Sequence, residues 1–148
     1  MANSETKTIE VLVGRPGRDE LTLSLALADG GEIREAKLRA IGCPDLLKLV
    51  SDYRSRLKGV LTQVPLPDGQ DHAAMLVREC LLRARGEWTP PYTDVELCHC
   101  RAVPTAVVDE AIVCGARTVA AVSRKTSAGT SCGTCKTDIE AMLNFRTK

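Results

Sequence analysis

Residues 97–135 read LCHCRAVPTAVVDEAIVCGARTVAAVSRKTSAGTSCGTC, with a tight pair of cysteines at each end. Between the pairs, a proline followed by an apolar run and then a glycine predicts one helix, and a threonine before a second run predicts another. If this helical hairpin returns on itself, the two pairs meet. We therefore expect residues 94–148 to form a small all-α helix–turn–helix unit around four thiolates. These belong to Cys98, Cys100, Cys132 and Cys135.

Four converging thiolates are the ligand set of a structural zinc ion or of an iron–sulfur cluster. The few large apolar side chains of this unit predict a thin core, which usually needs a metal or disulfide staple. The second pair precedes a predicted helix, where unpaired backbone N–H groups stabilise thiolate charge. Zinc sites more often use two C-x2-C arms, whereas the first arm here is C-x-C. The residues alone leave both metals open.

The segment from Val95 to Leu143 resembles the bacterioferritin-associated ferredoxin-like (BFD-like) domain, which is also the central domain of NifU proteins. The resemblance rests on CHC at 98–100, VPTAVVDEAI at 103–112, GARTVAAVSRKT at 115–126 and AGTSCGTC at 128–135. It implies a [2Fe-2S] cluster bound by the four cysteines named above. Cys114 matches no ligand position, and the side chain of His99 should point away from the cluster.

The N-terminal half predicts an α+β domain over residues 1–87, followed by a proline-containing linker at 88–93. Alternating leucines over 21–27 and a second strand over 33–41 predict a hairpin around Asp29-Gly30-Gly31. Residues 8–13 are a weaker strand candidate. Pro44 begins a helix that we expect to reach Leu57, and Asp71 caps a second helix that ends at Gly86. Antiparallel strands followed by helices are the expected architecture.

This half is similar to IscU and to the N-terminal scaffold domain of NifU, on LTLSLALADGGEIREAKLRAIGC at 21–43 and HAAMLVRECLLRA at 72–84. That family builds a transient cluster on three cysteines and an aspartate, of which only Cys43 and Asp19 have counterparts. Gly17 and Ala73 stand where the other two cysteines would be. The set Asp19, Cys43 and His72 is then either a degenerate site or a weak mononuclear zinc or iron site.

Composition limits the function classes. The chain has 148 residues, a net charge of +1 and 3% aromatic residues, which argues against nucleic acid and anionic membranes as partners. We expect no membrane span and no secretory signal, and hence a cytoplasmic protein. Two histidines without a catalytic neighbour pattern predict no enzymatic activity.

The leading hypothesis is a NifU-like [2Fe-2S] protein that acts in one-electron transfer or in iron–sulfur cluster assembly. An alternative is a zinc-stapled protein-interaction adaptor that uses the same four cysteines. A third is a working assembly scaffold in which a homodimer supplies the missing ligands. The expected partner is a redox protein or an iron–sulfur assembly protein.

Overall fold

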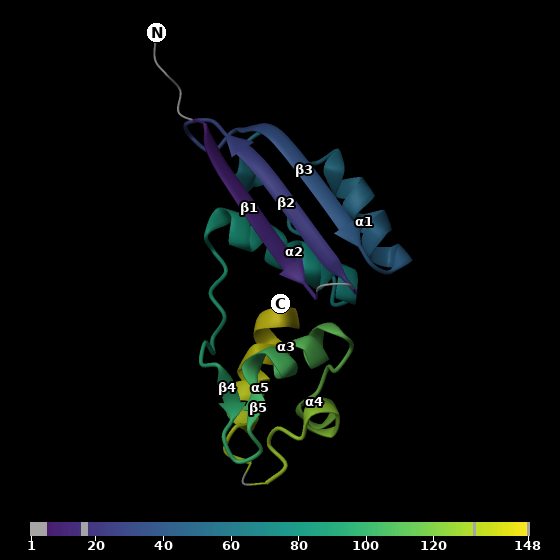
Figure 1. Cartoon of the computed structure of the whole chain (residues 1–148), viewed down its shortest axis with the longest axis vertical. Helices are drawn as coiled ribbons and strands as arrows, with labels where there is room; N and C mark the ends of the chain where they lie inside the picture. Colours follow the sequence, from purple (N-terminus) through teal and green to yellow (C-terminus); the bar gives the residue numbers. More distant parts are fainter. Residues whose placement is uncertain (1–5, 16–17, 132, 148) are drawn as a thin grey trace. The chain divides into compact units, whose positions relative to one another are not determined.

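The structure is a computed structural model that describes residues 6–15, 18–131 and 133–147 (Figure 1). The chain divides into two compact units, Met1–Asp68 with Leu76–Trp88, and Gly69–Met75 with Thr89–Lys148. The fold is α+β, with antiparallel strands followed by helices, as the sequence predicts.

The first unit contains a three-stranded antiparallel sheet in the order β1 (Lys7–Gly14), β2 (Glu20–Leu27) and β3 (Ile33–Ile41). The predicted hairpin is confirmed, and so is the weaker first strand. The leucines of β2 at 21, 23, 25 and 27 are all buried, because alternate residues of a strand face the same side. This period of two gives the sheet one apolar face for the helices.

Two helices supply the other side of this core, α1 (Pro44–Arg54) and α2 (His72–Arg85). Both meet the apolar face of the sheet around a small gap. It is lined by Leu21, Leu23, Leu38, Tyr53, Leu57, Val77, Cys80 and Leu81. As predicted, Asp71 caps α2, accepting a hydrogen bond from the Ala74 N–H at 3.3 Å. Burial raises the pKa of the Cys80 thiol to about 12, so this cysteine is an inert part of the core.

Helix α1 is shorter than the sequence predicts, since it ends at Arg54 and not at Leu57. A tight turn follows, in which the Arg56 N–H donates to the Tyr53 carbonyl at 2.9 Å. Leu57 is nevertheless buried, so its apolar signal was read correctly as core and wrongly as helix. A 3-10 turn at Leu61–Gln63 follows and was not predicted.

The second unit contains α3 (Thr105–Val113), α4 (Val119–Thr126) and α5 (Lys136–Thr147). The predicted helical hairpin is therefore present. Thr118 caps α4, because its hydroxyl accepts from the Ala121 N–H at 3.0 Å. The three helices contribute a small apolar core, which includes Val108, Ile112, Val122, Ile139, Met142 and Leu143.

The expectation of an all-α unit is corrected by a short antiparallel ladder, β4 (Glu96–Cys98) and β5 (Val103–Pro104). Strands of three and two residues are too short to show a period of two, so the sequence pattern could not reveal them. The ladder matters for the site, because Cys98 is the last residue of β4 and pairs with Val103.

A buried ion pair joins α3 to α5. Arg146 donates from Nε and Nη2 to the two carboxylate oxygens of Asp109 at 2.7 and 2.6 Å. Arg146 is only 4% exposed. Such a bidentate pair fixes the relative rotation of the two helices as well as joining them.

Candidate metal centre

The first cysteine pair lies at the turn between β4 and β5. Cys98 is buried and is held by the ladder, whereas Cys100 lies in the turn and is exposed. The turn closes through Ala102, which has a positive φ of 51°. The geometry therefore presents one sulfur from inside the unit and one from its surface.

The second pair lies in the loop between α4 and α5. Cys135 is buried directly before α5, and its carbonyl accepts from the Ile139 N–H at 3.0 Å. Cys132, the other predicted ligand of this loop, lies outside the described residues. Gly129, at φ +75°, lets the loop pass close to the cysteines.

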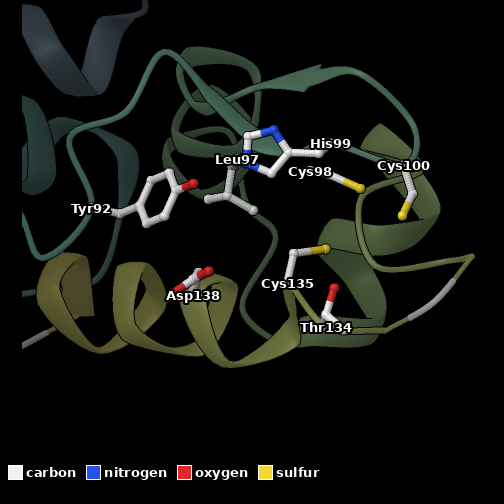
Figure 2. Close-up of a pocket in the computed structure, with 8 residues that line it drawn as sticks. All are labelled: Tyr92, Leu97, Cys98, His99, Cys100, Thr134, Cys135 and Asp138. Atoms are coloured by element: carbon white, nitrogen blue, oxygen red, sulfur yellow. The ribbon is translucent and has the colours of Figure 1, made fainter.

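The three described members of the two cysteine pairs line one pocket of about 230 Å³. Figure 2 shows the sulfur atoms of Cys98, Cys100 and Cys135 gathered at one end of it, with Tyr92 and Asp138 at the other end. Thirty-one residues lie between the two cysteine pairs in the sequence, and β4 and the start of α5 bring members of both pairs to one place. The predicted convergence is thus observed for these three residues.

Backbone amides make this place suitable for thiolate sulfur. The pKa of Cys98 is lowered, first because the Gly129 N–H donates to its sulfur, with the amides of Arg101 and Cys100 adding to the effect. Burial raises the pKa of Cys135, and its thiol also donates a hydrogen bond to the sulfur of Cys98. The N–H of Gly129 faces both sulfurs, and the backbone amides around Cys98 favour negative charge on its sulfur.

This donor set fits an iron–sulfur cluster. Iron–sulfur clusters take thiolate ligands, and amide-to-sulfur hydrogen bonds and burial tune them. The site supplies cysteine sulfur atoms from both ends of the hairpin. It also supplies backbone amides that donate to this sulfur.

The side chain of His99 was expected to point away from the cluster. It is 73% exposed and lies 3.0 Å from Glu96 Oε1, so it sits at the rim among the lining residues. Tyr92 and Asp138 were not singled out by the sequence. Tyr92 follows two prolines in what was read as a linker, and only its hydrogen bond to the Glu96 carbonyl, at 3.0 Å, reveals its place.

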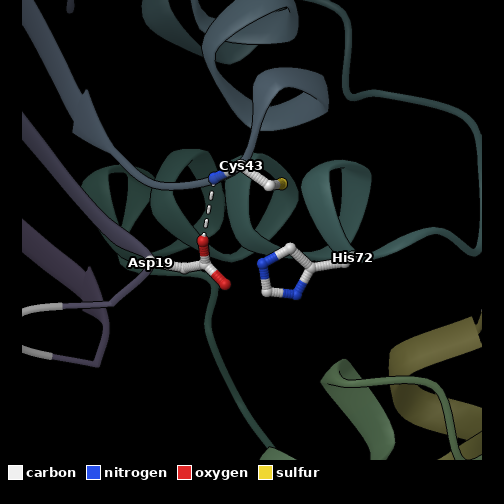
Figure 3. Close-up of side chains that lie close together, drawn as sticks. All are labelled: Asp19, Cys43 and His72. Atoms are coloured by element: carbon white, nitrogen blue, oxygen red, sulfur yellow. Dashed lines mark hydrogen bonds between the residues drawn. The ribbon is translucent and has the colours of Figure 1, made fainter.

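The residues predicted as a second site also lie together (Figure 3). Asp19, Cys43 and His72 each offer one ligand atom, and these atoms lie within 4.8 Å of one another. The Cys43 N–H donates to Asp19 Oδ1 at 3.1 Å. His72 is the first residue of α2, a continuous helix that reaches the core of the sheet further along.

Glycine is required beside this cluster. A Cβ atom on Gly42 would lie 2.3 Å from Asp19 Oδ1, so a side chain there would displace the carboxylate. Cys43 is the N-cap residue of α1, and its side chain makes no capping hydrogen bond. Its thiol thus stands at the positive end of a helix dipole. Of the two positions that lack a cysteine, Ala73 is buried in α2, and Gly17 lies outside the described residues.

Comparison with known proteins bears on the C-terminal site. Residues 97–144 match the family described as BFD-like [2Fe-2S] binding domain. No match was found among curated proteins or among solved structures. Among the described residues, no helix is both long enough and apolar enough to span a membrane. The match decides between the two metals that the residues left open. Residues 97–144 are thus similar throughout to a BFD-like [2Fe-2S] binding domain, and the cofactor of this chain is a [2Fe-2S] cluster.

Proposed function

We propose that this chain acts in one-electron transfer or in iron–sulfur cluster assembly, with Cys98, Cys100, Cys132 and Cys135 as the cluster ligands. One observation carries the proposal: the three described cysteines of this set line one pocket inside the segment that matches a [2Fe-2S] binding domain. The fourth follows from the sequence, since it belongs to the same C-x2-C arm as Cys135.

The residues of the chain would bind the cluster and set its affinity for an electron. A bound [2Fe-2S] cluster supplies one-electron redox chemistry. The Gly129 N–H, directed at Cys98 and Cys135, stabilises negative charge on sulfur. Cys98 and Cys135 are buried, which limits water at these ligands, whereas the exposed Cys100 offers a short route for an electron to the surface.

We propose that the protein is a carrier and not an enzyme, and that it works in the cytoplasm with a protein partner. The thiols that line the pocket are proposed cluster ligands, and a thiolate bound to iron is not free to act as a catalytic nucleophile. An exposed ligand cysteine suits contact with a redox or assembly partner.

A reductive titration of the full chain, purified without oxygen, tests this function. We expect visible absorbance that bleaches on addition of one electron per chain, because a [2Fe-2S] cluster takes up one electron. Incubation with an apo-ferredoxin then separates the two roles: electron transfer leaves the iron on this chain, and assembly moves it to the acceptor. Visible absorbance that no reductant bleaches would contradict the proposal.

A second candidate function concerns the N-terminal half, which we propose to be an IscU/NifU-like domain with an incomplete ligand set. The grouping of Asp19, Cys43 and His72 favours a mononuclear zinc or iron site. A thiolate, an imidazole and a carboxylate are all common zinc ligands. They are too few and too mixed to hold a [2Fe-2S] unit in the manner of four thiolates.

Zinc binding to the full chain tests this second site. With the cluster in place, we expect one further zinc ion to bind, and Cys43→Ala to weaken it at least tenfold because the thiolate is the strongest donor of the three. Competition with a chromophoric zinc chelator measures the affinity. Cys114→Ala is the matched control, since that cysteine is exposed. Equal affinities in the wild type and in Cys43→Ala would show that no such site exists.

A further inference from the structure

We propose that Lys136 is a positioning residue for the cluster: its side chain straps the loop that carries the second cysteine pair, and its ammonium group increases the affinity of the bound cluster for an electron. This inference rests on the proposed function. It concerns a residue that is no ligand and that the sequence pattern did not single out.

The environments of two glycines show where the side chain of Lys136 lies. A Cβ atom on Gly129 would lie 3.3 Å from Lys136 Cγ, which is closer than an ordinary contact. A Cβ atom on Gly133 would lie 3.6 Å from Lys136 Cε and 3.9 Å from its Nζ. The stem of the lysine therefore runs from one glycine to the other, across the loop. Long cationic side chains commonly cover a surface in this way while their charged ends remain in water.

The position of the Lys136 ammonium group indicates a role other than stabilising the helix. Lys136 is the first residue of α5, where the helix dipole disfavours a cation. Helix stability therefore does not explain a lysine here. Its Nζ lies back over Gly133, which is flanked in the sequence by Cys132 and Thr134. Four thiolates and two sulfides together outweigh the positive charge of two ferric irons, so the cluster is negatively charged, and its negative charge grows when an electron is added. A nearby ammonium group stabilises the reduced form more than the oxidised form.

Charges of the opposite sign lie at the pocket itself, which Lys136 does not line. Asp138 lines it from α5, and Glu96 lies 3.0 Å from the rim residue His99. Both carboxylates disfavour an additional negative charge on the cluster. The ammonium group of Lys136 opposes them from the side of the cysteine loop. The stem of Lys136 also lies beside Gly129, the residue whose N–H faces the sulfurs of Cys98 and Cys135.

Reduction potentials of the full, cluster-loaded chain test the inference. Lys136→Met retains most of the stem and removes the charge, and Lys136→Arg retains the charge. At low ionic strength we expect Lys136→Met to lower the equilibrium constant for reduction about threefold, as for one partly screened unit charge. High salt should shrink the difference. Lys136→Arg should match the wild type, and Lys125→Met, an exposed lysine in the last turn of α4, should change little.

The inference fails if Lys136→Met leaves the potential unchanged at low salt, or if Lys125→Met shifts it equally. Failure of the proposed function looks different, since a chain without iron and sulfide has no such potential to measure. Faster loss of visible absorbance in Lys136→Gly than in Lys136→Met would support the strap, because only the second variant keeps a stem over the two glycines.

Discussion

Replacing Cys98 by serine is expected to abolish the visible absorbance of the chain and to unfold its C-terminal half. The buried sulfur of Cys98 receives several backbone amides, so no other side chain can take its place. The core of this unit is small, and in so small a unit metal binding and folding are coupled. The helical signal of α3, α4 and α5 should therefore be lost together with the cluster.

Circular dichroism and thermal melting measure this effect, and Cys114→Ser provides the control. Cys114 is exposed at the end of α3 and lies outside the pocket lining, so its replacement should leave spectrum and melting nearly unchanged. Unaltered helical content and melting in Cys98→Ser would mean that the helices fold without the cluster. Cluster binding and folding would then not be coupled in this unit.

Asp109→Ala is expected to destabilise the same unit by about 3 kcal/mol, because it leaves the buried guanidinium of Arg146 without its carboxylate. The half-exposed position of the Asp109 side chain lets some water reach the site, so the loss should lie at the low end for a broken buried pair. Urea denaturation of the cluster-loaded protein, followed by the visible absorbance, measures the loss.

Two further variants show whether the pair itself is responsible. The double variant Asp109→Leu with Arg146→Met replaces both charges by apolar groups and should recover most of the stability. Glu140→Ala, an exposed change on α5, should stay within about 0.5 kcal/mol of the wild type. If Asp109→Ala lowered the free energy of unfolding no more than Glu140→Ala does, the ion pair would not stabilise the unit.

Much of this fold could be predicted from sequence patterns that span only a few residues. The alternating leucines of β2 gave the sheet, and Pro44, Asp71 and Thr118 marked helix starts that the structure confirms. The predicted end of α1 was wrong, because an apolar residue such as Leu57 looks the same in the sequence whether it is buried in a turn or in a helix. Only the fold could show that Arg146 meets Asp109, 37 residues away in the sequence.

Some residues of the candidate site could be predicted from the sequence, and others could be found only in the structure. Cysteine spacing was specific enough to indicate a four-thiolate site, but ligand type did not separate zinc from iron. Tyr92, Asp138 and Lys136 belong to no motif, and their place around the pocket or its loop depends on how β4 and α5 are folded. Asp19, Cys43 and His72 were found only through a resemblance, and geometry then placed them together.

We propose that sulfur atoms from both ends of the helical hairpin hold the [2Fe-2S] cluster. Iron and acid-labile sulfide, counted in the full chain purified under strict exclusion of air, test it most directly. We expect two irons and two sulfides per chain, and none in Cys98→Ser. A colourless protein that contains zinc in place of iron, or no metal at all, would contradict it.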